Sequence, residues 1–359
     1  MSCAAGSRTI RIMNVTNPSM NQTGRGARIL FCAAAAVIIL AGLKAAAPLV
    51  VPILAAIFLA VVSLPALAFL CRTGMPRWLA ATCLLIVIVF LILWATAIAT
   101  QNVAVLAQQI PQYRSILDAK LLEFNTDLAA RGIHLDLDTL ISKTNPSDVL
   151  GYASDFVKAL ANLAQSGLFV ILTLAFLLGE ASVLPSKIRM ITGRPEDDLG
   201  RYRKIMIDIQ SYLAVKSQTN FLTAVLVTLS CYALNTPYAL FIGLAAFFLN
   251  YIPTFGAIIT AIPAVLLCLA VNTWQTALIM LVLQVFINLA IGSWLEPKLF
   301  GRKLGLSAAV VFLSLVFWGW ILGPVGMFLS VPLTMLVKIL LDNTEEFKWI
   351  SILLGPGKS

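Results

Sequence analysis

The stretch LNYIPTFGAIITAIPAV, from Leu249 to Val265, interrupts an otherwise apolar region with Pro253, Gly256 and Pro263. Proline removes a backbone donor from a helix, and its ring clashes with the preceding turn. Inside a lipid bilayer a carbonyl freed in this way has no water to bind, so broken backbone persists only against protein or a wet cavity. The stretch therefore raises the question of what lies beside this break.

The composition of the whole chain is that of a membrane protein. Of its 359 residues, 60% are hydrophobic and only 11% are charged, and the mean hydropathy is +0.94. A soluble domain carries about 25% charged residues, and a run of roughly 20 apolar residues can cross a bilayer as a helix. We expect an all-α polytopic protein with about eight transmembrane helices plus broken helical hairpins. The candidate spans are 29–46, 48–70, 78–100, 161–183, 217–235, 237–252, 255–271, 274–294, 306–322 and 324–341.

Four of these spans are short and form two pairs, each joined at a Pro/Gly break. The second break lies in ILGPVGMFLSVPLTML, residues 321–336, which contains Pro324, Gly326 and Pro332. Each pair is either two thin crossings or a re-entrant hairpin. Interrupted apolar segments in corresponding positions indicate a transporter binding site. Simple helix kinks without a ligand are the alternative.

Charge predicts the orientation of the chain. Basic residues gather in 1–28, 71–77, 185–216, 295–305 and the C-terminal tail, whereas 101–160 has five basic and seven acidic residues. By the positive-inside rule the basic segments and both termini face the cytoplasm. The net charge of +9 resides in these loops, so no nucleic-acid partner is expected.

Residues 29–46 are interpreted as a membrane span that stays in the protein, rather than as a cleaved secretory signal. The chain is then expected to have seven parts. The parts are a disordered cytoplasmic N-terminus (1–28), membrane helices (29–100), a periplasmic helical segment (101–160), a membrane helix (161–184), a cytoplasmic amphipathic segment (185–216), a membrane transport core (217–341) and a cytoplasmic tail (342–359).

Two segments outside the spans show apolar residues at helical spacing. From Val103 to Leu128 such residues recur every three or four positions, which predicts an amphipathic helix continuing out of the third span. A second helix is expected to begin at Asn145-Pro146. We interpret 101–160 as an oligomer or packing module, with a ligand-binding ectodomain as the alternative. On the other side, the stripe from Tyr202 to Leu213 is typical of a helix lying among anionic headgroups.

Catalytic and metal chemistry find little support. The six cysteines form no CxxC pair, His134 is the only histidine, and GxSxG, HExxH and GxGD motifs do not occur. We expect neither an enzyme nor a bound cofactor or metal. A pure structural scaffold is also disfavoured, because paired helix breaks in lipid serve no scaffold role.

Neutral polar residues, rather than charges, mark the deep membrane. Gln284, Asn288, Gly292 and Glu296 follow one another at steps of four, and Asn250 flanks the first break. Each alone is explained by interhelical hydrogen bonds, but together they suit an uncharged, hydroxyl-rich ligand. The predicted substrate-binding residues are Asn250, Pro253, Gly256, Gln284, Asn288, Pro324 and Gly326.

The run EPKLFGRKLGLS, residues 296–307, has two interpretations. It is a cytoplasmic turn anchored by basic residues, or a gate in which Glu296 pairs with Arg302 or Lys303.

Several motifs together resemble the autoinducer-2 exporter family of bacterial membrane proteins. They are NYIPTFGAIITAIPA (250–264), EPKLFGRKLGLS (296–307), VVFLSLVFWGWILGPVGMFLSVPLTMLVKILLD (310–342) and PQYRS (111–115). The likeness extends from about residue 30 to 342. It implies an inner-membrane, multi-span transporter that assembles as a homo-oligomer, with a pentamer as the expected number, and that moves in an elevator-like manner.

The resemblance implies export of the quorum-sensing signal autoinducer-2 or a similar small polar solute. Some members of the family are sodium(lithium)/proton antiporters, which is the alternative function. The lack of an acid at mid-membrane depth favours the neutral solute, because ion-driven pumps usually place an ionisable group there.

Overall fold

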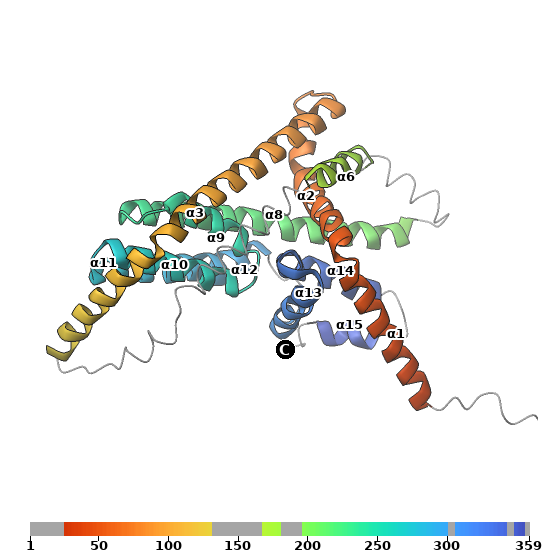
Figure 1. The fold of residues 1–359 in the computed structure, drawn as a ribbon. Helices are drawn as coiled ribbons and strands as arrows, with labels where there is room; N and C mark the ends of the chain where they lie inside the picture. The colour runs from red at the N-terminus through yellow and green to blue at the C-terminus, as the bar shows by residue number, and fades with distance from the viewer. Residues whose placement is uncertain (1–24, 131–166, 181–195, 301–305, 343–347, 356–359) are drawn as a thin grey trace, which may run out of the picture. The chain divides into compact units, whose positions relative to one another are not determined.

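The computed structural model describes residues 25–130, 167–180, 196–300, 306–342 and 348–355, and within them it contains helices and no strand. The all-α prediction is therefore confirmed. The elements are α1 (Arg25–Ala45), α2 (Ala47–Arg72), α3 (Arg77–Ala130), α6 (Gly167–Glu180), α8 (Glu196–Ala233), α9 (Ala239–Leu249), α10 (Phe255–Val271), α11 (Trp274–Asn288), the π-helical η1 (Leu289–Leu295), α12 (Glu296–Phe300), α13 (Ala308–Phe328), α14 (Ser330–Asp342) and α15 (Lys348–Leu354) (Figure 1).

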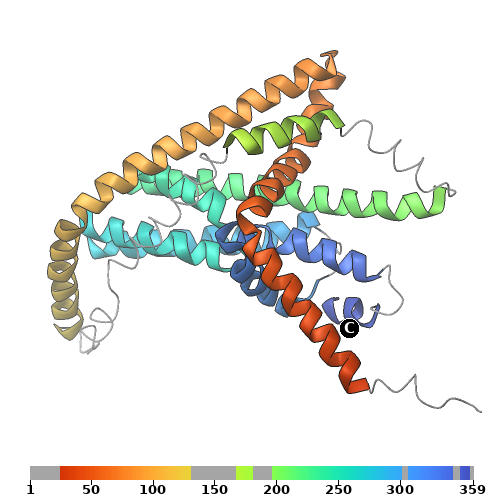
Figure 2. The ribbon, with the colours of Figure 1, turned by 45° about the vertical axis from the view of Figure 1, so that its right-hand side comes forward.

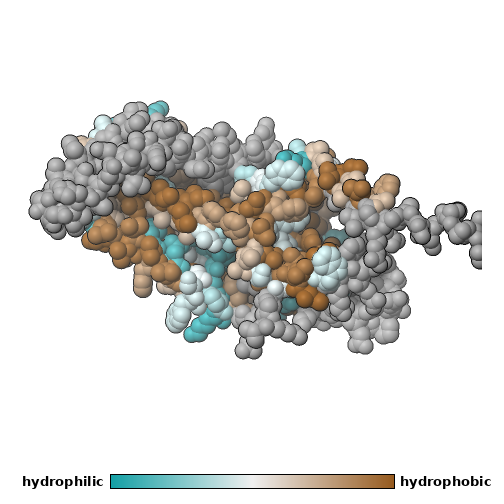
Figure 3. All heavy atoms as spheres, turned by 90° about the horizontal axis from the view of Figure 1, so that it is seen from below, coloured by the Kyte–Doolittle hydropathy of each residue, from teal (hydrophilic) through white to brown (hydrophobic). Residues whose placement is uncertain are grey.

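Four helices of the described residues are long and apolar enough to cross a bilayer. They are α2, the first part of α3 (Arg77–Leu106), the continuous run Trp274–Phe300 and α13. Shorter apolar helices, among them α6, α9 and α10, accompany them. Apolar side chains cover much of the coloured surface in Figure 3, with smaller hydrophilic patches between them. Such a surface is stable against lipid and not against water.

The chain divides into two units. The first, Met1–Ala46, contains α1, a 21-residue helix whose large apolar side chains, such as Phe31 and Ile38, are exposed. The second, Ala47–Ser359, contains all the other helices and everything described below.

Helix α3 continues beyond the membrane span, as the apolar spacing of Val103–Leu128 predicts. Its 54 residues give a length of roughly 80 Å along the helix axis, against the ~30 Å of a bilayer core, and the helix bends towards its C-terminal end (Figure 2). The outer half is tied to the same chain: Tyr238 donates to Gln109 Oε1 at 2.6 Å, and Lys120 donates to the carbonyl of Asn272. The second helix expected from Asn145 lies outside the described residues.

Helix α8 runs without interruption through the predicted boundary at residue 216. Ile209 and Leu213 belong to the stripe that we expected among lipid headgroups, but both are buried against protein, with Phe300 of α12 and Val331 of α14 in the same cluster. The headgroup interpretation is therefore wrong for these two residues. Their apolar face is covered by α12 and α14 instead.

Two further hydrophobic clusters help to hold the second unit together. One joins α2, α3 and α6 through small and branched side chains such as Ala56, Ala80 and Leu174. The other joins α8, α9, α10 and α11, with α8 beside α9 and α10 beside α11 (Figure 2). Its buried members are Val227, Cys231, Ala239, Ile242, Ala246, Ala264, Leu267, Cys268, Met280, Ile287 and Ile291.

Both predicted helix breaks are present, although not at every proline. The first lies between α9 and α10, where Thr254 adopts φ 66°. Pro263 does not break α10, which runs through it to Val271. In the second pair the backbone kinks at Gly323 (φ 68°, ψ −152°) inside α13 and turns again at Leu329. Proline breaks a helix only where the neighbouring backbone can leave helical geometry, and glycine at 323 permits that.

The helix that begins at Trp274 does not end at Glu296-Pro297. It passes through the π-helical η1, in which the amide of Glu296 donates to the carbonyl of Ile291, and ends at Phe300. Proline lacks an amide hydrogen, and here it follows the change from five-residue to four-residue hydrogen-bond spacing, where the helix is already irregular.

Candidate functional site

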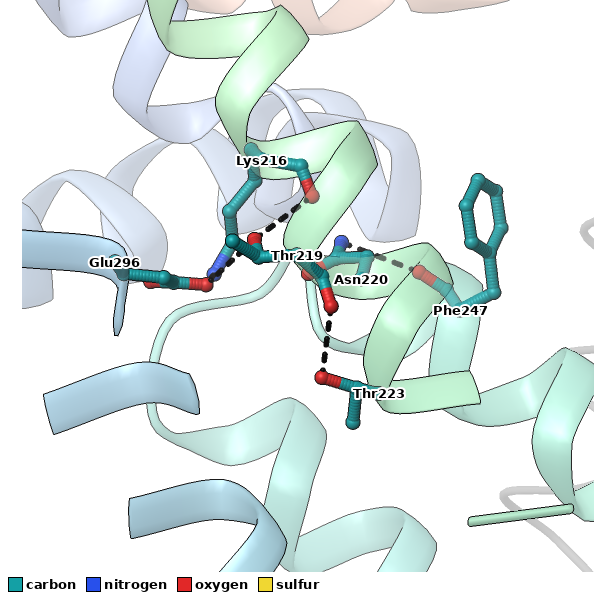
Figure 4. A network of polar contacts seen from close by, with 6 residues as sticks. All are labelled: Lys216, Thr219, Asn220, Thr223, Phe247 and Glu296. Carbon is teal, nitrogen blue, oxygen red and sulfur yellow. Dashed lines mark hydrogen bonds and ion pairs between the residues drawn. The ribbon is translucent and has the colours of Figure 1, made fainter. Parts of the chain in front are cut away.

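A polar face of α8 forms the centre of the site. Lys216, Thr219, Asn220 and Thr223 recur at steps of three and four, so they share one side of the helix. All four are buried, Thr219 and Asn220 to 1% exposure. Figure 4 shows how this face meets the other residues of the network, Glu296 and Phe247. Such residues, buried in an apolar bundle, need partners, because an unpaired polar group in hydrocarbon is costly.

An ion pair joins α8 to the start of α12. Lys216 Nζ lies 2.6 Å from Glu296 Oε1, with the two side chains 11% and 16% exposed. Thr219 Oγ1 lies 3.0 Å from the same carboxylate oxygen and 3.1 Å from the carbonyl of Lys216, and its single hydrogen serves one of them at a time. Glu296 is thus held by α8. Arg302 and Lys303, the partners expected for Glu296, lie outside the described residues, so that pairing stays a prediction.

The π-helical segment helps to place Glu296. In an unbroken α-helix three steps of four residues, from Gln284 to Glu296, rotate the side chain by roughly 120°. The wider turns of η1 hold more residues each and reduce this rotation. As a result Glu296 faces α8 on the same side as Met280, which lies one turn before Gln284: Met280 Sδ lies 3.9 Å from Ser230 Oγ, and Glu296 contacts Lys216.

The break after α9 is completed by a side chain from α8. Carbonyls in the last turn of a helix have no partner within it. Asn220 Nδ2 donates to one of these, the carbonyl of Phe247, at 3.2 Å (Figure 4). The neighbouring carbonyl of Ala246 accepts from the amide of Asn250 at 3.1 Å. Protein, in the form of Asn220, therefore lies beside the freed backbone of the opening stretch.

Two buried amide side chains keep an acceptor free. Gln284 is fully buried, its Nε2 lies 3.8 Å from Met280 Sδ, and its Oε1 has no partner among the described residues. Asn250 is 9% exposed, and its Oδ1 is likewise unpartnered there. Asn288 is different, because its Nδ2 donates to the carbonyl of Gln284 in its own helix at 2.8 Å. Gln284 and Asn250 can each accept a hydrogen bond from a hydroxyl-bearing molecule.

The two predicted glycines have a packing role. A Cβ at Gly256 would lie 1.9 Å from the carbonyl oxygen of Leu249, and one at Gly326 would lie 2.1 Å from that of Trp318. Each glycine thus lets the second limb of a broken pair approach the backbone of the first. Pro253 precedes the strained Thr254 in the link between α9 and α10.

The two breaks meet in space. Tyr251, in the link after α9, packs against Phe328 of α13 with ring centroids 4.2 Å apart and the ring planes tilted by 37°. Beside them is a cavity of about 220 Å³ with an almost wholly apolar lining. Its walls come from both breaks and from α2, α3 and α6: Ala55, Phe58, Leu59, Val89, Ile92, Leu93, Ala95, Gly167, Val170, Ile171, Phe248, Leu249, Ile252, Pro324, Val325, Phe328 and Leu329.

The predicted site residues therefore divide between two places. Pro324 lines the apolar cavity, whereas Gln284 lies in the polar interior beside α8. Sequence reasoning missed Lys216, which stands one position before the expected span and was counted as a loop charge. It also missed Tyr251, although this tyrosine lies inside the opening motif. Its signal in the sequence is an aromatic side chain with a hydroxyl, two positions before the proline of the break.

Comparison with known proteins agrees with this architecture. The model of the family described as "AI-2E family transporter" matches residues 33–346, and the chain belongs to this family. It is 36% identical over 333 residues to the AI-2 transport protein TqsA of Escherichia coli (strain K12), covering 93% of this chain and 97% of that protein. It is 32% identical to the putative transport protein YhhT of the same organism (95% and 97% covered), and 33% identical to a putative transport protein of Haemophilus influenzae (91% and 96%). The chain is thus a multi-pass membrane transporter.

Proposed function

We propose that this transporter exports a small, uncharged, hydroxyl-rich solute, with the quorum-sensing signal autoinducer-2 as the first candidate. The observation that carries the proposal is the free acceptor oxygen of Gln284 in a fully buried position, supported by that of Asn250. Buried amides without partners are disfavoured unless something else is gained. Reversible binding of a hydroxyl group is such a gain. The name of the relative TqsA, an AI-2 transport protein, supports this choice of solute.

The charges of the polar face are consistent with a neutral solute. Lys216 and Glu296 neutralise one another within 2.6 Å, so this face presents no net charge to a passing molecule. A charged solute would lose most of its hydration on entering and would need an opposite charge to replace it. A hydroxyl-rich solute needs only donors and acceptors.

Labelled autoinducer-2 and inverted membrane vesicles test the proposal. Vesicles that contain the protein should accumulate the label several-fold faster than vesicles without it. Vesicles carrying Gln284→Leu serve as a matched control at the same protein level. Equal uptake by all three preparations would remove autoinducer-2 as the solute.

The second candidate function is sodium(lithium)/proton antiport, and one observation favours it. Lys216 and Glu296 form an ion pair of low exposure, and ionisable pairs of this kind occur on proton and ion pathways in membranes. The same vesicles, loaded with a pH-sensitive dye, distinguish the two functions. Sodium-dependent proton movement that Glu296→Gln abolishes, without autoinducer-2 uptake, would favour the antiporter.

We also propose that the protein lies in the bacterial inner membrane, with both termini cytoplasmic and 101–160 periplasmic. The support is the distribution of basic residues. An alkaline phosphatase fusion at Gly132 should be active and one at Gly193 inactive. The reverse pattern would overturn the orientation.

We further propose a homo-oligomer, with a pentamer as the expected number. The support is the outer half of α3, which carries apolar residues well beyond the length that a bilayer covers. The native mass in detergent measures the oligomer directly, and a monomer there would contradict the proposal.

A further inference from the structure

Three aromatic rings from three separate elements meet where the two helix breaks come together. Tyr251 contributes from the link between α9 and α10, Phe58 from α2 and Phe328 from α13. The centroid distances are 5.7 Å between Phe58 and Tyr251, 4.9 Å between Phe58 and Phe328 and 4.2 Å between Tyr251 and Phe328. We call these three residues the aromatic cluster. It contains a direct contact between the first broken pair and the second, and Phe255 of α10 and Phe312 of α13 form another.

Tyr251 also ties the cluster to the polar face of α8. Its ring is 4% exposed, and its hydroxyl lies 2.6 Å from Ser217 Oγ. Ser217 is adjacent to Lys216, and Thr219, Asn220 and Thr223 follow along the helix. One side chain thus stands between the polar interior and the apolar cavity, with its hydroxyl on the polar side.

The backbone on both sides of the cluster departs from helical geometry. Thr254 holds φ 66°, ψ −47°, an uncommon conformation for a residue other than glycine, and Gly323 holds φ 68°, ψ −152°. Such positions cluster at switch regions and ligand clamps. They lie three residues after Tyr251 and five residues before Phe328, so a change at either joint moves a ring of the cluster.

The cavity supplies the space that such a movement needs. Protein interiors are close-packed, so a buried ring can leave its place only where empty volume adjoins it. Phe58 and Phe328 both line the cavity of about 220 Å³. A dry, apolar cavity of about 150 Å³ accepts a benzene molecule. The space beside the cluster is therefore large enough for a displaced phenyl ring, and its apolar lining suits one.

We propose that the aromatic cluster is the gate of the solute pathway, with Tyr251 as its latch on Ser217. In the structure the gate is closed. It opens when the ring of Phe58 or Phe328 moves into the cavity and Tyr251 releases Ser217, which exposes the polar face of α8. The proposal deepens the proposed function, because it assumes a solute pathway along that face.

The gate can be tested without knowing the solute, through the reactivity of a cysteine behind it. Thr223 is 3% exposed and close to cysteine in size, so Thr223→Cys, in a chain whose six native cysteines are replaced by alanine, reports access to the polar face. The purified protein in nanodiscs is treated with a small, water-soluble thiol reagent, which reaches both faces. Tyr251→Ala should raise the labelling rate tenfold or more.

Filling the cavity should have the opposite effect. Ala55 lines the cavity, and Ala55→Leu places three more carbon atoms in the space that the ring requires. We expect the labelling rate of Thr223→Cys to fall several-fold. Ala68→Leu is the matched control, because Ala68 is an exposed residue of the same helix and does not line the cavity. It should leave the rate unchanged.

Tyr251→Phe provides a second test in case the Tyr251→Ala variant does not fold. It keeps the ring and removes only the hydroxyl that meets Ser217. Labelling should rise by less than in Tyr251→Ala, and its dependence on Ala55→Leu should persist. An unchanged labelling rate in both Tyr251→Phe and Ala55→Leu would overturn the gate. A failure of autoinducer-2 uptake alone would count against the proposed solute and not against the gate.

Discussion

The first broken helix pair is α9–α10. The second is divided at the kink at Gly323, so its first limb is α13 up to that residue and its second limb is the end of α13 together with α14. The two pairs have the same backbone contact at the point where their limbs come closest. In each, a glycine of the second limb lies against a carbonyl of the first: Gly256 against Leu249, and Gly326 against Trp318. A methyl group at either position would stand within 1.9 to 2.1 Å of that oxygen. The similar spacing of Pro and Gly in the two stretches thus reflects a shared backbone geometry.

The pairs differ in which helices supply the hydrogen bonds near each break. The first depends on α8, because Asn220 binds the carbonyl of Phe247 at 3.2 Å. The second closes on itself: Trp318 Nε1 donates to Thr334 Oγ1 at 3.0 Å, and Thr334 Oγ1 donates to the carbonyl of Ser330 at 2.7 Å. The difference is that α8 supplies a hydrogen bond to the first break, whereas the second pair makes these hydrogen bonds within itself.

The largest effect is expected from the close contact between a glycine and a backbone carbonyl that both pairs share. Gly256→Ala and Gly326→Ala should each lower stability by about 3 kcal/mol or more, at or above the upper end of overpacking, because the contact is with backbone that cannot give way. Thermal unfolding in detergent measures the loss. Gly179→Ala, with nothing within 4 Å of its Cβ, is the control. Normal stability in only one of the two variants would break the similarity between the pairs.

Two further glycine substitutions, one in α9 and one in the first part of α13, test how tightly the first limb of each pair is packed. A Cβ at Gly243 of α9 would lie 1.8 Å from Thr228 Oγ1 and 2.9 Å from the carbonyl of Ala224, both on α8. At Gly319 of α13, the three atoms nearest to an added Cβ all belong to the flexible side chain of Met327. Gly243→Ala should cost about 1–3 kcal/mol, and Gly319→Ala clearly less in the same unfolding assay. Equal losses would contradict the dependence of the first pair on α8.

Removing a hydrogen bond should also lower the stability more in the first pair than in the second. Asn220→Leu leaves the buried carbonyl of Phe247 unpaired, which costs about 1–3 kcal/mol. Trp318→Phe removes one bond of the second pair, worth about 0.5–1.5 kcal/mol, while Thr334 still binds Ser330. Chemical denaturation of the two variants, each against the parent protein, compares them. A larger loss in Trp318→Phe would reverse the assignment.

The smallest expected effect concerns transport alone. Gln284→Leu removes a free acceptor beside the first pair and should slow uptake about tenfold, equivalent to about 1.4 kcal/mol, while the protein still assembles. Asn288→Leu should slow it in the same direction. Ser330→Ala in the second pair, whose buried Oγ is also unpartnered among the described residues, should leave uptake unchanged. Equal uptake by Gln284→Leu and the parent would move the solute site away from α11.

Much of the fold follows from local patterns. The apolar runs predict helices, the Pro/Gly clusters predict both breaks, and the spacing from Val103 to Leu128 predicts the extension of α3. These features depend on residues near one another in the chain. The local pattern does not predict which of several prolines breaks a helix. Pro263 continues α10 while Pro253 accompanies a break, because neighbouring backbone geometry decides the outcome.

The site was less predictable, because its contacts join distant parts of the chain. Glu296 was expected beside nearby basic residues, yet its partner among the described residues is Lys216, 80 positions earlier. Ile209 and Leu213 were assigned to lipid headgroups but are covered by other helices. An apolar helix face looks the same in sequence whether lipid or protein covers it.

The sequence by itself determined that this protein is a helical membrane transporter of the AI-2E family and where its helices are interrupted. Composition, breaker residues and motifs are properties of the chain that need no partner. Only the tertiary structure decided that Asn220 completes the first break, that Lys216 holds Glu296 and that Tyr251 meets Phe328. Hydrogen bonds, ion pairs and ring contacts act over a few ångströms, so they depend on which helices pack together and not on distance along the chain.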